Sequence, residues 1–175
     1  MLTLDHLKNE TRLSRQWHLH APVPGQWVGI NAVGAWEQGA FGKPEIKVVV
    51  FDTGVDIDHP NLKRNIDLRA AKDFDHGLEE DGQPLTEEEL DGLRKGTLDG
   101  SQTKARISNP YDAHGTACAG IVAADGSPGG CVGTAPRCQV VPIRINTNLD
   151  FKSLIAALAY AETAGHVILM PRWLP

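Results

Sequence analysis

The feature that most constrains the fold is an apolar run that begins at Lys47 and ends abruptly on Asp52, Thr53 and Gly54. Residues 48–51 are β-branched and aromatic without a polar interruption, which predicts a strand buried on both faces. Burying a lone carboxylate inside such a strand is costly, so Asp52 is expected at its C-terminal end, where open α/β sheets place their ligands. Gly54 permits the turn that follows. A structural alternative is an Asp52 that only satisfies backbone N–H groups in that turn.

Length and charge narrow the class of protein. The chain has 175 residues, 41% of them hydrophobic and 22% charged, which is enough for one globular domain with a core. A net charge of −5 without a basic stripe argues against a nucleic-acid partner. No apolar run approaches the roughly 20 residues of a membrane span, and no secretory signal is visible at the N-terminus. The sequence therefore indicates no membrane partner and leaves the compartment open.

The first part of the chain is polar and punctuated by proline and glycine. We interpret residues 1–26 as an N-terminal arm that lies over the surface of a domain spanning residues 27–175. His18 and His20 alternate in a pattern typical of a solvated strand edge. Two histidines without a third ligand do not define a metal site.

A short helix is expected over residues 30–39. Asn31 suits its N-cap and Gly39 its C-terminal end. Ile30, Val33 and Trp36 recur at helical spacing, which predicts that they face the core.

The segment 73–100 is rich in glycine and acidic residues. Oxygen ligands at Asp73, Asp75 and Asp81 make it a weak candidate for a calcium site. Their spacing is not that of an EF-hand loop, and a solvated loop is the alternative. Thr86 and Glu89 match a capping box, which predicts a short helix through Leu93. Calcium is the one cofactor the sequence suggests.

A second informative stretch surrounds His114. Small residues from Gly115 to Ala124 predict a helix that begins at His114, with Asp112 as its cap, and packs closely against the sheet. His114 in the first turn would project toward the strand ends, where a neutral imidazole can accept a proton. The alternative is a histidine that merely caps the helix.

The remaining pattern completes an α/β fold. Residues 140–145 predict a strand in which Pro142 marks an irregular or weakly paired point. A helix over residues 152–164, capped by Asp150 or Ser153 and ended by Gly165, carries an apolar stripe at Leu154, Ile155, Leu158 and Ala161. Residues 167–170 open a third strand. Strand, helix and strand in this order predict a parallel sheet with a right-handed crossover.

The chain has three cysteines, Cys118, Cys131 and Cys138. In an oxidising compartment, Cys131 and Cys138 would suit a small disulfide. Two cysteines without further nearby ligands argue against zinc at this pair.

Several motifs together resemble the subtilisin-like serine proteases (subtilases). Residues 49–55 and 59–62 are similar to the aspartate motif of that family, and residues 114–120 to its histidine motif. Residues 132–136 and 16–19 resemble the segments that follow and precede them. The resemblance implies a subtilisin-like α/β domain and a serine endopeptidase that acts on peptide or protein substrates. It also implies an Asp…His…Ser triad, in which Asp52 orients His114 and His114 takes the proton of the nucleophile. Cys118, one helical turn after His114, is expected beside the site without being the nucleophile.

The sequence also departs from the family. The Gly-Thr-Ser motif of the nucleophile and the oxyanion-hole asparagine have no counterpart, and the five serines lie in other contexts: Ser14, Ser101, Ser108, Ser127 and Ser153. The likeness stops after Ile168. We therefore expect an incomplete catalytic domain, with its C-terminal half absent by truncation or frameshift, that is inactive alone.

Two alternatives remain from the sequence. One is a non-catalytic or trans-complementing module whose partner is a C-terminal half that carries the serine. The other is a retroviral-type aspartic protease, in which Asp52 of the Asp-Thr-Gly sequence pairs with the same residue of a second copy. Specificity and oligomeric state are not predicted.

Overall fold

The core of the fold is a parallel sheet in a computed structural model that describes residues 2–19, 29–74, 113–145 and 151–171. Four strands pair in the order β2-β3-β1-β4, and every pair is parallel. They are β1 (Lys47–Asp52), β2 (Lys72–Asp73), β3 (Gln139–Arg144) and β4 (Val167–Leu169). The sequence predicted β1, β3 and β4. The two-residue β2 was missed because it is too short to show a pattern.

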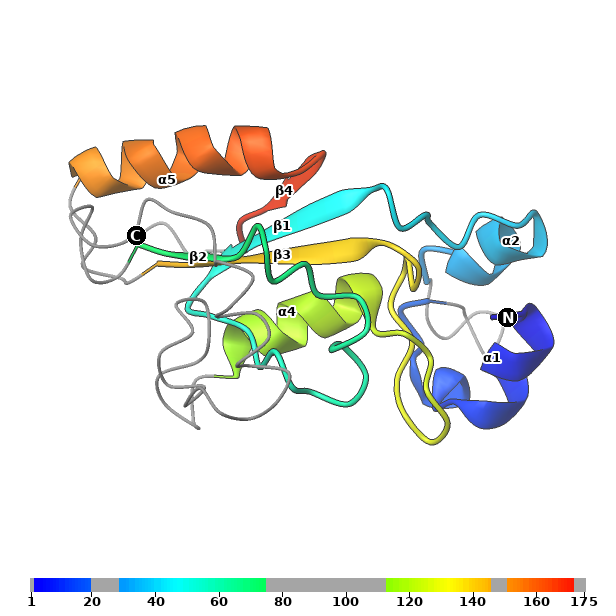
Figure 1. The fold of residues 1–175 in the computed structure, drawn as a ribbon. Coiled ribbons are helices and arrows are strands. Elements are labelled where there is room, and N and C mark those ends of the chain that lie inside the picture. Colours follow the sequence, from blue (N-terminus) through cyan, green and yellow to red (C-terminus); the bar gives the residue numbers. More distant parts are fainter. Residues whose placement is uncertain (1, 20–28, 75–112, 146–150, 172–175) are drawn as a thin grey trace.

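Helices cover both faces of this sheet, α5 (Phe151–Ala164) on one side and α4 (His114–Ala123) on the other (Figure 1). Side chains of a strand alternate between faces. Val49 and Phe51 accordingly join the core under α5, whereas Val50 joins the core under α4. Asp52 follows Val50 by two residues, so the alternation places it on the α4 face. This arrangement confirms the predicted parallel α/β fold.

Pro142 lies in an interior strand, at a point where pairing on one side of that strand is interrupted, as the sequence predicted. Val140, two residues before it, donates its N–H to the Asn65 carbonyl. The carbonyl of Arg144, two residues after it, accepts from the Phe74 N–H. Pro142 therefore faces the same side, where β2 pairs only with the last two residues of β3. The missing N–H of the proline breaks no ladder bond there.

The N-terminal segment is more buried than an arm over a surface would be. It forms α1 (Leu4–Glu10) and the short 3₁₀ helix Leu13–Arg15. Leu7, Leu13 and Leu19 are buried in one cluster with Trp36 and Phe41. The division of the chain at residue 26 itself stays a prediction.

His18 lies in a turn and not on a strand edge. The strand edge that the alternation of His18 and His20 indicated is therefore wrong at His18. His20 lies outside the described residues.

The predicted helix near residue 30 is α2 (Ala32–Glu37). Asn31 caps it, because its side chain accepts a hydrogen bond from the Gly34 N–H. Gly39 follows it with a positive φ of 84°, as expected for a helix end. Trp36 is buried, but Ile30 is exposed because it precedes the cap and is not on the helix.

The contact face of α5 differs from the predicted stripe. Ala157 and Ala161 are fully buried and Leu154 packs beside them, whereas Ile155 and Leu158 are exposed. The small alanines let the helix lie close to the sheet, which turns the larger side chains outward. Gly165 ends the helix as predicted.

Several predictions fall outside the described residues: most of the acidic segment, the helix after Thr86, and the caps Asp112 and Asp150. Within the described ranges, no helix combines the length and apolar character needed to cross a bilayer.

Candidate active site

Asp52 ends β1 with its carboxylate 2% exposed. Its Oδ1 accepts hydrogen bonds from the Thr53 N–H at 2.7 Å and the Thr53 hydroxyl at 3.1 Å. The turn-capping interpretation is thus correct for Oδ1. The role of Thr53 was missed by sequence reasoning, although an Asp followed by a hydroxyl residue at a turn is the signal that would have found it.

His114 is the first residue of α4, as predicted, and its ring reaches back to Asp52. Nδ1 lies 2.9 Å from each carboxylate oxygen of Asp52. A carboxylate can only accept, so Nδ1 must carry the ring proton and donate it. Nε2 is then the unprotonated nitrogen of the neutral ring. The His114 side chain is 58% exposed, so the ring remains accessible from outside.

Close backbone packing holds the two residues together. A Cβ on Gly115 would lie 2.1 Å from the Gly54 carbonyl oxygen and 3.0 Å from Asp52 Cβ, so glycine alone permits this approach. Gly54 itself has a φ of 116°, which favours glycine at the turn. Thr116 fixes the same turn, since its hydroxyl accepts from the Asp56 N–H at 2.9 Å. The Thr116 contact was not predicted.

The N-cap residue of α4 is Ala113, whose side chain makes no capping hydrogen bond, and the predicted cap Asp112 lies outside the described residues. Gly115 and Thr116 contact the turn after β1, and these contacts hold this end of the helix against the sheet.

Cys118 lies one turn after His114, with Sγ 4.0 Å from Nδ1. Burial, and secondly the charge of Asp52, raise the pKa of its thiol. Both effects favour the neutral thiol, which is a poor nucleophile. The cysteine thus lies beside the pair, as the sequence predicted.

The other two cysteines do not pair. Cys131 is an exposed free thiol and Cys138 a buried one. Cys138 packs against Gly42, where an added Cβ would lie 2.6 Å from its Sγ. The disulfide expected for an oxidising compartment is therefore not present.

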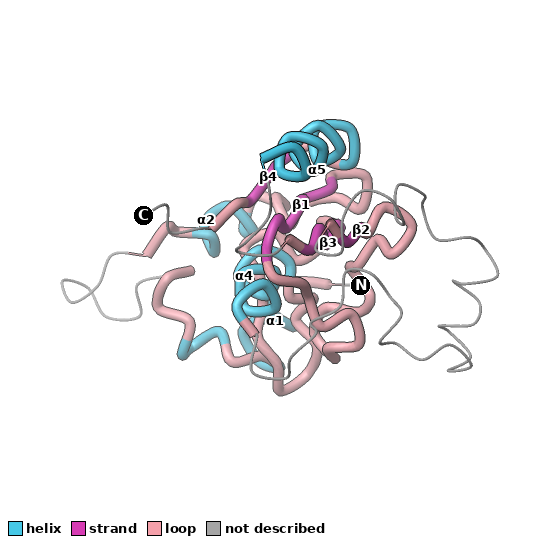
Figure 2. Tube along the Cα trace, turned by 90° about the vertical axis from the view of Figure 1, so that its left-hand side faces the viewer, coloured by secondary structure: helices cyan, strands magenta, loops and turns pink. Residues whose placement is uncertain are grey.

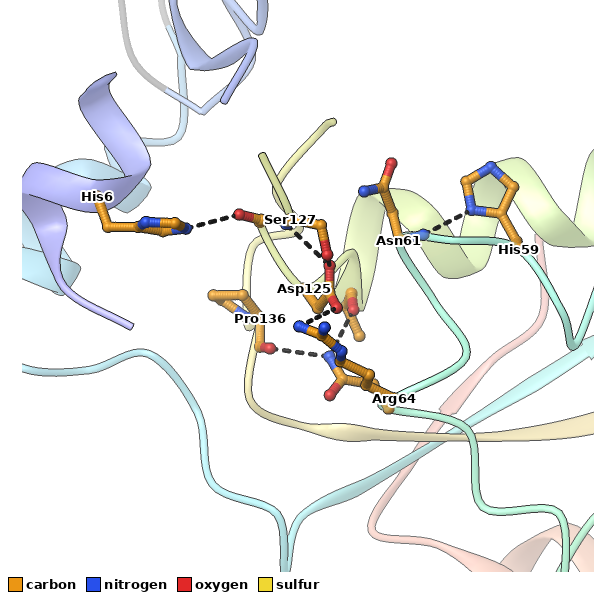
Figure 3. Close-up of polar contacts among 10 residues, drawn as sticks. His6, His59, Asn61, Arg64, Asp125, Ser127 and Pro136 are labelled. Carbon is orange, nitrogen blue, oxygen red and sulfur yellow. Dashed lines mark hydrogen bonds and ion pairs between the residues drawn. The ribbon is translucent and has the colours of Figure 1, made fainter. Parts of the chain in front are cut away.

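Polar contacts within the loop after α4, and with Arg64 and His6 outside it, hold the loop in place (Figure 3). Asp125 accepts from the Ser127 N–H at 2.9 Å and from the Ser127 hydroxyl at 2.6 Å. Arg64 lies 3.8 Å from the other oxygen of Asp125, and His6 contacts the carbonyl of Gly126. The hydroxyl of Ser127 is thus committed to Asp125.

A pocket of about 870 Å³ opens beside this loop, between the turn around His59 and the outer side of α4. Thr116 and Ala117 contribute to its wall, whereas Asp52 and His114 do not. The pocket and the Asp–His pair are therefore separate features of α4.

The calcium candidates stay a prediction. Asp73 belongs to β2, and Asp75 and Asp81 lie outside the described residues. The grouping of possible metal ligands that the described residues do bring together is Asp52, His114 and Cys118.

The chain matches the family model described as the subtilase family over residues 43–170. It is 31% identical over 165 residues to the proprotein convertase subtilisin/kexin type 5 of Branchiostoma californiense, covering 92% of this chain and 8% of that protein. It is 33% identical over 138 residues to the major intracellular serine protease of Bacillus subtilis strain 168, covering 75% of this chain and 34% of the protease. The chain thus spans about a third or less of these two relatives.

Solved structures support the same fold. The serine protease of Aeromonas sobria, solved in complex with its chaperone, superposes with a TM-score of 0.60 at 23% identity, covering 89% of this chain and 23% of that one. The epidermin leader peptide processing serine protease of Staphylococcus aureus superposes with a TM-score of 0.53 at 23% identity, covering 91% of this chain and 32% of that one.

Proposed function

The chain belongs to the subtilase family, and we propose that Asp52 and His114 are the orienting carboxylate and the general base of a serine endopeptidase site. The observation that carries the proposal is the bond from Nδ1 of the ring to the buried carboxylate, at 2.9 Å to each oxygen. In this arrangement the ring proton is already on Nδ1, and Nε2 is ready to accept a second one.

In this proposal His114 acts first as a general base and then as a general acid. Nε2 of His114 takes the proton of a serine hydroxyl while the serine oxygen bonds to the carbonyl carbon of a peptide or protein substrate. The imidazolium passes that proton to the leaving amine as the peptide bond breaks. Asp52 stabilises the imidazolium and holds the ring orientation throughout.

The nucleophile is the part that these 175 residues do not supply in our proposal. Among the described residues, no serine hydroxyl bonds to His114, and that of Ser127 is held by Asp125. Ser101 and Ser108 lie outside the described ranges and lack the family's serine motif. We therefore expect the chain alone to be inactive. We expect the complete site to need a serine from the serine-bearing part of a subtilase catalytic domain.

A second candidate function is a module that supplies Asp52 and His114 to a separate serine-bearing chain. The observation in its favour is β4, whose Val167 and Ile168 are exposed and whose described strand partner is β1. The occupant we propose for this edge is the serine-bearing part of a subtilase catalytic domain. Such a part would add a strand and cover apolar surface.

The aspartic protease alternative does not agree with the fold. It requires an all-β dimer in which two aspartates share a proton, whereas this chain has a parallel sheet between helices. Here the Asp52 carboxylate bonds to a histidine instead.

The test uses the purified chain and a serine-directed fluorophosphonate probe. We expect no labelling and no casein hydrolysis by the chain alone. Mixing with the serine-bearing remainder of the Bacillus protease should give labelling that the His114→Ala variant abolishes, with Cys131→Ala as the matched control. Stoichiometric labelling of the chain alone, or equal labelling of the His114→Ala mixture, would contradict the proposal.

A further inference from the structure

We propose that Asp52, His114 and Cys118 form a binding site for a divalent d¹⁰ cation such as Zn²⁺. These residues bring three different ligand atoms together, a carboxylate oxygen, an imidazole nitrogen and a thiol sulfur, all within 4.8 Å of one another. Each is a ligand type that zinc uses in proteins. The subtilase assignment does not require this site, and the proposal rests on the geometry alone.

The distances suit one small cation. Zinc bonds of about 2.0–2.3 Å in a tetrahedral site separate neighbouring ligand atoms by roughly 3.3–3.6 Å. Nδ1 of His114 lies 2.9 Å from Oδ2 of Asp52 and 4.0 Å from Sγ of Cys118, so the two separations lie on either side of that range. The carboxylate oxygen and the sulfur lie within 4.8 Å of each other, so the Cys118 side chain would move by about 1 Å to complete three ligand bonds.

Access and rigidity also favour a site. Asp52 is fixed by Thr53, and His114 and Cys118 are one turn apart on α4, so the ligands come from two elements already packed together. The His114 side chain is 58% exposed, so solvent reaches the ring, and a water would supply the fourth ligand. Three protein ligands and one water match the open form of a zinc site.

Cation binding at this site balances in both charge and protons. Carboxylate, thiolate and neutral imidazole carry −2 together and neutralise a divalent cation. The thiol of Cys118 must release its proton to solvent as the sulfur–metal bond forms. The ring proton leaves Nδ1 for Nε2 as the nitrogen–metal bond forms. The net change is one proton released for each cation bound to the neutral site.

Occupancy would switch the base off, and this consequence, unlike the binding, rests on the proposed function. The cation replaces the hydrogen bond between His114 and Asp52. With its proton on Nε2, the ring has no lone pair left to accept a proton from a serine. The site is therefore inhibitory in our account.

The experiment titrates the 175-residue chain with Co²⁺, which absorbs in the near ultraviolet when a thiolate is a ligand, and then displaces it with Zn²⁺. We expect one cation per chain with a thiolate band. Cys118→Ala and the volume-conserving Cys118→Ser should abolish the band. They should weaken affinity more than about 100-fold, since even outer-shell changes cost 10–100-fold. Cys131→Ala, which removes the other accessible thiol, should leave the band unchanged. Circular dichroism confirms that each variant is folded.

Three outcomes would overturn the proposal: a band that survives in both Cys118 variants, binding without a thiolate band, or a band lost in Cys131→Ala. None depends on proteolysis, because the titration needs no serine. A negative titration together with His114-dependent labelling in the mixing experiment would remove the metal site and leave the proposed function intact.

Discussion

The α4 side of the sheet and the margin at α5 and β4 differ because the margin includes an edge strand of the described sheet with exposed apolar side chains. On the α4 side, Gly115 lies against the backbone of the turn after β1, and Ala119 is fully buried. Both helices bury an alanine and expose an isoleucine, Ile121 on α4 and Ile155 on α5, whereas Val167 of β4 is 52% exposed at the sheet edge. Figure 2, which views the sheet from its side, shows α5 and β4 together at one margin of the molecule.

The difference separates the part of the fold that holds the Asp–His pair from the part that leaves a sheet edge open. The α4 side forms the Asp–His pair from β1 and α4 alone. The margin at α5 and β4 displays apolar side chains and a sheet edge, which natural proteins ordinarily cover or pair. We therefore expect substitutions on the α4 side to damage the chain itself, and substitutions at the β4 margin to affect what the chain associates with.

The largest effect is expected for Gly115→Ala. The added Cβ meets the Gly54 carbonyl at 2.1 Å, and this overpacking should lower the free energy of unfolding by about 3 kcal/mol. The matched control is Gly120→Ala in the same helix, where a Cβ meets nothing within 4 Å. It should raise stability by about 0.5–1 kcal/mol because it removes a helical glycine. Equal changes in the free energy of unfolding of the two variants, measured by urea denaturation, would contradict this prediction.

A smaller effect should distinguish the inner and outer sides of α5. Ala161→Leu places a large side chain where the alanine is fully buried, and should cost about 1–3 kcal/mol. Ile155→Ala removes a half-exposed side chain and should change stability by less than about 0.5 kcal/mol in the chain alone. Thermal unfolding followed by circular dichroism measures both. A large loss in Ile155→Ala would show that this margin is already packed.

The pH dependence of Cys118 tests the electrostatics of the site. Its raised pKa, due first to burial and then to Asp52, predicts that iodoacetamide labels it at higher pH than glutathione. Asp52→Asn should move the profile only part of the way back, since burial remains. The raised value also means that this thiol stabilises the fold below its unfolded pKa, and that the contribution is lost as the pH rises through the folded pKa. In denaturant the difference from glutathione should vanish. Labelling at the pH of glutathione in the folded chain would contradict the assignment.

The smallest effect on stability is expected at the sheet edge. Val167→Lys puts a charge on an exposed position of β4 and should change unfolding by less than about 0.5 kcal/mol. It should nevertheless reduce the fluorophosphonate labelling of the mixture with the serine-bearing part, because edge lysines oppose strand pairing. Unchanged labelling of that mixture would mean that the serine-bearing part does not bind at this edge.

The sequence predicted the elements whose pattern is local. The apolar run before Asp52 predicted both the strand and the position of Asp52 at its end, because a carboxylate is costly to bury inside a strand. The small residues after His114 predicted the close approach of α4. Ile155 was misassigned because helical spacing alone does not say which neighbouring face contacts the sheet. The burial of Leu7 was missed because it depends on Trp36, which is distant in sequence and close only after folding.

The most direct test of the central claim is the tautomer of His114, read by nitrogen-15 NMR of the histidine rings in the 175-residue chain. We expect a proton on Nδ1, held by Asp52, and none on Nε2. In Asp52→Asn the side-chain amide turns an N–H toward Nδ1, so the proton should move to Nε2. Cys131→Ala should leave the ring unchanged. A proton on Nε2 in the parent chain, or a His114 ring that does not respond to Asp52→Asn, would contradict the account.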